Sequence, residues 1–318
     1  MAKWLNYLIP KKKGQHKAVL GVSITTQGAA WCVLEKGAER PTVTAHAAVE
    51  GHFRSPKEGF AALLAQQVPP ALPCHISLSH HFYQMLLVDA PNVPDAEMRD
   101  AVKWRVKDLI TQPIEKMVVD VFRLPADAYR GRMNMVYSAL IEQAAVAPLV
   151  SACDDAGLAL ESVSIAELAL ASLSRHLAET ENRSLALLFL TGNDGSINLI
   201  ENGYLYLTRT LEMQGSAVYS GNVDFNQDPT DNLALDVQRS LDYYESQLGK
   251  SGVTRLYLVT ESVEQQLWCD DLSQRLPVRA QALPLTEIVQ LPQELGTLQQ
   301  GLLMPAVGMA LGAQHGTA

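Results

Sequence analysis

The chain is 318 residues long and carries 25 Lys and Arg against 34 Asp and Glu, a formal net charge of −9. Its 47% apolar residues are enough to bury a sizeable core, which excludes a disordered chain, and the length suits two domains or one large duplicated domain. The acidic balance argues against a general nucleic-acid-binding protein, so no nucleic-acid partner is expected.

The charge is distributed unevenly. Five lysines and no acidic residue lie in residues 1–17, and the first acid is Glu35, so the remainder holds 25 − 5 = 20 basic residues against 34 acids, a body of −14. Residues 1–17 form a basic arm. If this arm is helical, several of its apolar side chains lie on one face ahead of three lysines, which predicts a weak contact with an anionic membrane surface. The residues of this predicted contact are Trp4, Leu5, Leu8, Lys11, Lys12 and Lys13. A disordered arm with no lipid contact is the alternative.

Four cysteines at positions 32, 74, 153 and 269 lie far apart, with no C-x-x-C pair. This spacing fits neither a disulfide framework nor a zinc ribbon, and a reducing cytoplasm is the simplest setting. The opening segment lacks the basic start and the long apolar run of a secretory signal. The chain contains no run of 18 or more uncharged apolar residues, so no membrane span is expected.

Two groups of three strands separated by glycine turns are expected, at 18–24, 29–35 and 42–49, and again at 184–190, 196–200 and 204–209. The hairpin turns at Gly37 and Gly203 are about 166 residues apart, roughly half the chain, as expected if one unit of strands and helices occurs twice.

Between the two groups, strands are expected at 74–79, 82–88, 117–122 and 133–139, and helices at 94–110, 141–155 and 164–178. After the second group come a polar surface loop at 221–231, a helix at 234–248, a strand at 254–260, a helix at 263–275 and an apolar core helix at 302–311. We therefore predict an α/β protein whose first half spans 18–175 with a small β/α insertion at about 71–160, and whose second half spans 176–318.

Several stretches resemble the actin-like ATPase superfamily. Val237-Gln-Arg-Ser-Leu-Asp-Tyr-Tyr followed by Val253-Thr-Arg-Leu-Tyr-Leu is similar to the V-x-R-S-L-x-F-F…V-D-x-I-L-L pattern of the PilM family of cytoplasmic type IV pilus assembly proteins, and within it to the MshI group of MSHA pilus biogenesis. The two strand groups and the final Met304-Pro-Ala-Val-Gly-Met-Ala-Leu-Gly helix extend the resemblance over about 18–311. It implies an actin-like fold with duplicated RNase H-like halves.

Members of this superfamily hold ATP between the halves, and this chain departs from their motifs at four places. The family's L-G-I-D-I-S-S-T turn is Leu20-Gly-Val-Ser-Ile-Thr-Thr-Gln here, so Ser23 replaces an aspartate, while the family's V-D-I-G-A is Phe189-Leu-Thr-Gly-Asn, with Leu190 in place of the second acid. Only Gly215 remains of a later glycine pair, and Glu261 stands in the family's L-x-G-G-x stretch.

The resemblance thus implies a degenerate nucleotide cleft with no catalytic residue, no metal ligand and no cofactor. Its vestigial residues are Ser23, Thr25, Thr26, Gly192, Gly215 and Glu261. A shifted alignment, or Asp194 acting as the acid, leaves weak binding of ATP and Mg open.

The function that the resemblance implies is that of a scaffold at the cytoplasmic face of the inner membrane in MSHA-type IV pilus biogenesis. It would bind the cytoplasmic tail of a PilN-like single-span protein in a groove between the first subdomain and the insertion, and link it to the pilus assembly subcomplex. An ATP-binding switch in pilus or type II secretion assembly is one alternative. A sugar- or acetate-kinase-like phosphotransferase is another, weakened because phosphoryl transfer needs acidic groups to hold its metal.

Other chemistry receives little support from the residues. Cys74-His75 and His80-His81 alternate between the two faces of a strand, so a shared metal site is not expected. The chain contains no G-x-S-x-G, no P-loop motif and no G-x-G-x-x-G after a strand, which argues against covalent catalysis and a Rossmann site. The exposed side of 96–110 is mixed in charge, as a solvated helix face is.

Overall fold

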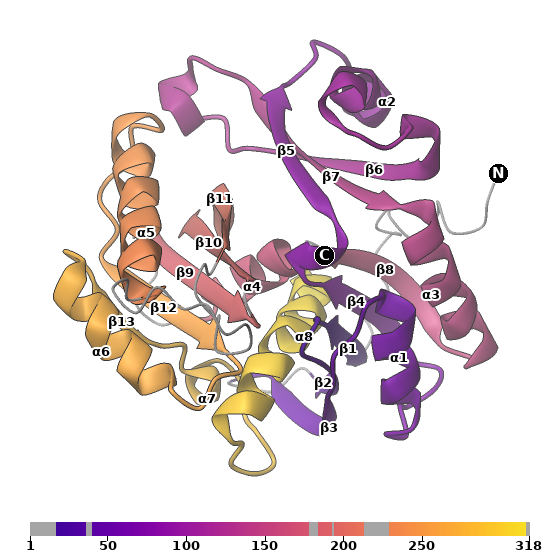
Figure 1. Ribbon diagram of the computed structural model, residues 1–318. Helices are drawn as coiled ribbons and strands as arrows, with labels where there is room; N and C mark the ends of the chain where they lie inside the picture. The colour runs from indigo at the N-terminus through magenta and orange to yellow at the C-terminus, as the bar shows by residue number, and fades with distance from the viewer. Residues whose placement is uncertain (1–16, 36–39, 178–183, 193, 213–228, 316–318) are drawn as a thin grey trace, which may run out of the picture.

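The computed structural model describes residues 17–35, 40–177, 184–192, 194–212 and 229–315, which form two five-stranded sheets, a three-stranded sheet and the helices around them (Figure 1). The main elements, in chain order, are β1 (Ala18–Ile24), β2 (Gly28–Glu35), β3 (Thr42–Glu50), α1 (Pro56–Leu64), β4 (Pro73–Leu78), β5 (Gln84–Asp89), α2 (Asp95–Val106), β6 (Met117–Arg123), β7 (Met135–Glu142), α3 (Gln143–Asp155), β8 (Ala159–Ile165), α4 (Ala166–Ser174), β9 (Ser184–Thr191), β10 (Asp194–Glu201), β11 (Tyr204–Glu212), α5 (Pro229–Ser246), β12 (Arg255–Thr260), α6 (Gln265–Arg275), β13 (Arg279–Ala282), α7 (Leu285–Ile288) and α8 (Thr297–His315).

The two five-stranded sheets have the same topology. Their orders are β3-β2-β1-β4-β8 and β11-β10-β9-β12-β13. In each, three antiparallel strands are followed by two strands that run parallel to the first strand of the group. The duplication expected from the sequence is therefore confirmed at the level of strand order.

Helices cover both faces of the first sheet, and this explains why β1 is a continuous apolar run. On one face, Leu20, Val22 and Ile24 pack with Phe60 of α1 and Leu149 of α3. On the other face, Val19 belongs to a core that includes the buried residues of α8. Figure 1 shows α8, in yellow, between the two five-stranded sheets.

The helices α4 and α8 are exchanged between the halves. α8 comes last in the chain but packs on β1 and β2 of the first half, whereas α4 follows the first sheet and packs on β10 and β11 of the second. The two helices also pack against each other. Because each sheet needs a helix from the other half to cover its inner face, the halves share one core.

The inserted subdomain is the sheet β5-β7-β6 with α2 packed on it, drawn at the top of Figure 1. β4 and β8 lie in the first five-stranded sheet and α3 packs on that sheet, so the insertion comprises about residues 84–142. It is shorter than the 71–160 expected from the sequence, because the flanking strands are the buried parallel strands that continue the first half.

The hairpin between β6 and β7 reaches the second half. Leu124, Ala128 and Tyr129 are buried in the core of the second sheet. The carboxylate of Asp127 accepts a hydrogen bond of 2.7 Å from the hydroxyl of Tyr206 and forms an ion pair with Lys250. These contacts anchor the inserted sheet on β11 and on the loop after α5.

Several elements differ from the expectations. The strand β8 was not expected, and neither were α1, β13 and α7; the helix expected over 164–178 is α4, preceded by β8. β8 is as short as β1 but is interrupted by polar residues (ALESVSI), so no apolar run marks it, and its pairing with β4 is a long-range contact. Gly215, the arm at 1–16, the turn at Gly37 and most of the loop at 221–231 lie outside the described residues.

None of the described helices is both long enough and apolar enough to cross a membrane.

Candidate functional site

The first candidate site is a cleft where the two five-stranded sheets meet at the ends of β1 and β9. Thr25 follows β1, and its Oγ1 accepts hydrogen bonds from the backbone N–H groups of Gln27 and Gly28, both at 3.1 Å. Thr191 is the last residue of β9. The duplicated strand order places these two threonines at corresponding turns of the two halves.

Glu261, directly after β12, connects the two threonines. Its Oε1 accepts a hydrogen bond of 3.1 Å from the hydroxyl of Thr25, and the hydroxyl of Thr191 lies 3.2 Å from Oε1 and 3.3 Å from Oε2. All three side chains are buried. The carboxyl of the second half is therefore held by its own half through Thr191 and reaches across the cleft to the first half through Thr25.

Burial raises the pKa of Glu261 to about 7, because removal of the carboxylate from water disfavours its charged form. The hydrogen bonds from Thr25 and Thr191 act in the opposite direction but offset only part of this effect. Both partners are neutral hydroxyl groups rather than cations, so the carboxyl is poised between its neutral and charged forms near neutral pH.

A cavity of about 320 Å³ adjoins this carboxyl. It is lined by Gln27, Glu50, Gly51, His52, Gly192, Thr260, Glu261, Ser262, Leu298 and Leu302.

Two glycines allow the elements around the cavity to approach closely. A Cβ on Gly192, which has φ +61°, would lie 2.6 Å from the side-chain nitrogen of Gln27. A Cβ on Gly301 of α8 would lie 2.3 Å from the carbonyl oxygen of Thr260. At Gly301 the obstacle is backbone, so this wall of the cleft is fixed, whereas at Gly192 it is the flexible end of the Gln27 side chain and the positive φ is what favours glycine.

Only some of the residues predicted for the nucleotide cleft contact one another. Thr25 and Glu261 meet, and Gly192 packs against the adjacent turn. Ser23 is buried within β1, where it pairs in register with Ser77 of β4. Thr26 contributes its backbone carbonyl, which accepts a hydrogen bond of 3.0 Å from the N–H of Phe53.

The sequence reasoning missed Thr191, Gln27 and Gly301. Thr191 was recognisable as the neighbour of Gly192 in the second turn, at the place that corresponds to Thr25 in the first. Gly301 had no comparable signal, because its role depends on where α8 crosses the end of β12.

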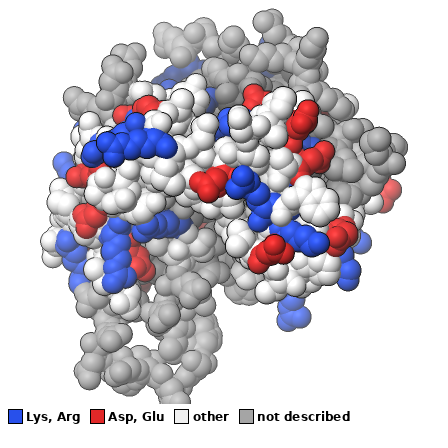
Figure 2. Space-filling model, turned by 90° about the horizontal axis from the view of Figure 1, so that it is seen from above, with Lys and Arg blue, Asp and Glu red and all other residues white. Residues whose placement is uncertain are grey.

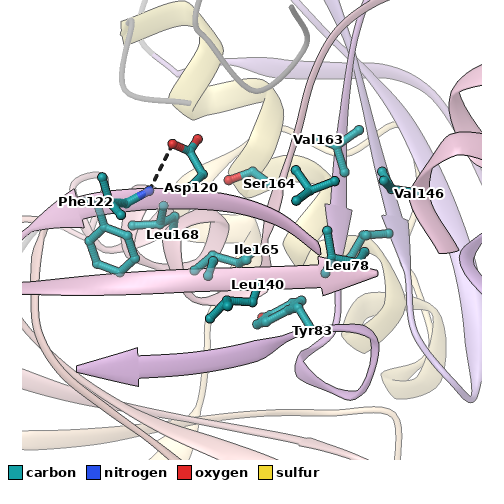
Figure 3. Close-up of a pocket in the computed structure, with 14 residues that line it drawn as sticks. Leu78, Tyr83, Asp120, Phe122, Leu140, Val146, Val163, Ser164, Ile165 and Leu168 are labelled. Atoms are coloured by element: carbon teal, nitrogen blue, oxygen red, sulfur yellow. Dashed lines mark hydrogen bonds between the residues drawn. The ribbon is translucent and has the colours of Figure 1, made fainter. Parts of the chain in front are cut away.

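The second candidate site is a groove between the first sheet and the inserted sheet. A cavity of about 110 Å³ lies between β4 and β8 on one side and β6 and β7 on the other, with α3 and α4 contributing side chains (Figure 3). Its lining is mostly apolar: Leu78, Tyr83, Val118, Asp120, Val121, Phe122, Ala139, Leu140, Ile141, Val146, Val163, Ser164, Ile165 and Leu168. Aliphatic side chains form most of the floor, as is typical of sites that receive apolar groups.

Two polar side chains of the groove are tied to neighbours. Asp120 lies 3.2 Å from the Nε of Arg99, and burial raises its pKa although Arg99 and the N–H of Val121 act to lower it. The hydroxyl of Tyr83 donates a hydrogen bond to Glu167, whose pKa is raised by burial. The polar groups are thus partly satisfied inside the protein, and the apolar floor is the part left for a ligand.

The outer face of α2 is mixed in charge. Trp104 is 72% exposed, with the Nζ of Lys107 5.6 Å from its ring centroid. Figure 2 looks onto the side of the molecule where the inserted subdomain lies, and its described positive and negative side chains are interspersed. This face has the character of a solvated surface.

The histidines and the cysteine near β4 do not form a metal centre. The Nδ1 of His75 lies 2.8 Å from the hydroxyl oxygen of Ser162, and Cys74 is buried in the core. Within the part of the chain that the structure describes, no group of three or more His, Cys, Asp or Glu is arranged to hold a metal ion.

The fold of this chain is similar to those of proteins of known structure. No family model matches the chain, and no curated protein matches its sequence. A chain of the PilM-PilN type IV pilus biogenesis complex is 20% identical with a TM-score of 0.71, over 96% of this chain and 100% of that one. A Bacteroides thetaiotaomicron protein with an actin-like ATPase fold and unknown function is 11% identical with a TM-score of 0.51, over 91% and 95% of the two chains. This protein therefore has the actin-like ATPase fold.

Proposed function

We propose that this protein is a scaffold in type IV pilus biogenesis of the MSHA type, acting at the cytoplasmic face of the inner membrane. Its groove between the first sheet and the inserted sheet would bind the cytoplasmic tail of a PilN-like single-span protein and link that protein to the pilus assembly subcomplex. The observation that carries the proposal is the apolar groove itself, in a chain whose fold is similar, over 96% of its length, to that of a chain of the PilM-PilN complex.

The chemistry of the groove supports a short peptide with apolar side chains as the ligand. Val121, Ala139, Val163 and Leu168 are partly exposed along it, while Leu140 beneath them is fully buried. Each apolar side chain that a peptide buries there contributes about 1.5–3 kcal/mol, so two or three are enough to offset the ordering of a short tail.

We also propose that the cleft no longer works as an ATPase site. Ser23 and Leu190 replace the acids that the resemblance predicts for metal and water, and the Glu261 carboxyl lies between the turns of the two halves. Phosphoryl transfer needs charged groups to hold its metal, and a buried carboxylate repels phosphate.

The ATP-binding switch is the second candidate, because the hydroxyls of Thr25 and Thr191 and the cavity beside Gly192 remain in the cleft. Calorimetry with Mg-ATP separates the two: micromolar binding to the wild-type protein that is lost on Gly192→Arg would contradict the degenerate site. Absence of heat at millimolar Mg-ATP supports it.

The basic arm is proposed to add a weak contact with anionic lipid through Trp4, Leu5, Leu8 and Lys11–Lys13. Lysines near an anionic surface contribute about 1 kcal/mol each, an effect that salt screens. Removal of residues 2–13 should therefore reduce co-sedimentation with phosphatidylglycerol vesicles, most strongly at low salt. Equal binding of the truncated and complete chains would rule out the contact.

The decisive experiment for the pilus role is binding of the tail. The purified full chain is titrated with a synthetic peptide of the cytoplasmic tail of a PilN-like protein of the same organism, and a scrambled peptide serves as the control. Saturable binding of the native peptide alone is expected, together with loss of surface pili when the gene is deleted. No binding, with pili intact in the deletion strain, would contradict the proposal.

A further inference from the structure

We propose that the cleft contains a small carboxyl-binding site whose ligand is the protein's own Glu261 side chain, and that this internal ligand ties the second half to the first. Thr191 holds the carboxyl within its own half at 3.2 and 3.3 Å, and Thr25 binds it from the opposite half at 3.1 Å. The inference rests on the proposal that the cleft is no ATP site, and it concerns what fills the cleft instead.

The turn that receives Glu261 is built to present a hydroxyl. Thr25 Oγ1 accepts from two backbone N–H groups of its own turn, and its hydroxyl lies 3.1 Å both from the carbonyl oxygen of Gly28 and from Oε1 of Glu261. A hydroxyl has one proton, so a charged carboxylate competes with the Gly28 carbonyl for it. A neutral carboxyl is a weaker acceptor than a carboxylate, so protonation of Glu261 reduces this competition for the Thr25 hydroxyl proton.

The surroundings make the tie sensitive to protonation. Among the described residues that line the adjoining cavity, the other titratable groups are Glu50, the last residue of β3, and His52, two residues further on, and both are exposed. α8 contributes Leu298 and Leu302, and the β1–β2 turn contributes Gln27. Burial raises the pKa of Glu261 to about 7 in this apolar and neutral setting.

Protonation of Glu261 stabilises the folded protein. The folded protein binds the proton of Glu261 more tightly than the unfolded chain, whose carboxyl has the ordinary value of 4.5. The stabilising contribution of this group is therefore complete below about pH 4.5 and is lost as the pH rises to about 7. Glu261→Gln is the neutral isostere, so it keeps the tie and removes this pH dependence.

The first test compares melting temperatures of the complete chain between pH 5 and pH 8. Between these limits the wild-type protein should lose about 2–4 °C more than Glu261→Gln. Other titrating groups are common to the two proteins, so their contribution cancels in the difference. Parallel profiles of the wild type and Glu261→Gln would overturn the inference, and this comparison remains decisive even if larger substitutions fail to fold.

The second test is replacement of the internal ligand. In Glu261→Ala, amide hydrogen exchange at residues 27 and 28 should become at least tenfold faster than in the wild type. Sodium acetate at pH 5, where part of it is neutral acetic acid, should reverse both this and the lower melting temperature. Sodium chloride at equal ionic strength serves as the salt control, and Glu264→Ala, an exposed carboxylate on the same segment, as the matched variant. Unchanged exchange in Glu261→Ala, or an equal response of the wild type to acetate, would overturn the inference.

The two proposals for the cleft fail separately. Micromolar binding of Mg-ATP to the wild type would contradict the degenerate nucleotide site, whereas an absent acetate response with no ATP binding would contradict only the internal ligand.

Discussion

Two cavities of this molecule border the first five-stranded sheet, and they differ in what fills them. The cleft at the end of β1 is crossed by a buried carboxyl with hydroxyl partners from both halves. The groove on the side of β8 is lined mostly by apolar side chains, several of them partly exposed. In a polar site whose hydrogen-bonding groups already bind the protein's own side chain, few of these groups remain for a ligand. Partly exposed apolar surface, by contrast, favours binding because its burial by a partner lowers the free energy. This contrast favours the groove as the site of binding.

The largest expected effect is a block of the groove. Ala139 lines it from β7 and is partly exposed, so Ala139→Arg would fill it with a long charged side chain. We expect tail-peptide binding to weaken by about 100-fold, equivalent to about 2.7 kcal/mol, in an isothermal titration. Ala144→Arg, at an exposed position of α3 outside the groove, is the matched control and should bind normally. Normal binding by both variants would place the tail elsewhere.

The next largest effect concerns the floor of the cleft. Gly301→Ala places a Cβ 2.3 Å from the carbonyl oxygen of Thr260 and 2.9 Å from the N–H nitrogen of Glu261, so α8 or the Glu261 loop must shift. We expect a loss of about 1–3 kcal/mol in the free energy of unfolding, measured by urea denaturation. Gly296→Ala has nothing within 4 Å of the added Cβ and should cost nothing. If both variants are equally stable, α8 does not constrain the cleft.

The anchor of the inserted sheet connects the groove to the second half. Lys250 has a side chain that is 9% exposed and forms ion pairs with Asp127 and Glu201. Lys250→Ala leaves these carboxylates without their shared cation, and because Asp127 is 62% exposed we expect a moderate loss of about 1–2 kcal/mol. Weaker tail binding should accompany it. Arg239→Ala, which removes an exposed pair with Asp236, should leave stability and binding unchanged.

The smallest expected effect is at the same anchor. The hydroxyls of Tyr129 and Tyr243 are 3.1 Å apart, so Tyr129→Phe removes one hydrogen bond and keeps the packing of the ring. A loss of about 1 kcal/mol is expected in thermal or urea unfolding. Tyr204→Phe, on a ring that is 59% exposed, serves as the control. A stabilised Tyr129→Phe would show that this hydrogen bond does not hold the inserted sheet on the second half.

The sequence predicted the repeated strand groups well, because strands such as β1 and β9 are short continuous apolar runs between glycine turns. It extended the insertion too far on both sides, since β4 and β8 can be assigned to the first sheet only when their partners are known. At the cleft, the family pattern singled out Thr25 as a retained hydroxyl and Glu261 as a departure, but no local signal indicated that the two side chains meet across 236 residues.

Composition and periodicity by themselves determined that the chain is a duplicated α/β protein with an acidic body and a basic arm. Those properties follow from local runs of residues, which the sequence displays directly. Only the tertiary structure decided that α4 and α8 are exchanged between the halves, that the hairpin after β6 is anchored at Lys250, and that Glu261 bridges Thr25 and Thr191 across the cleft. The physical reason is that each of these features depends on long-range packing, which brings together side chains that no sequence period relates.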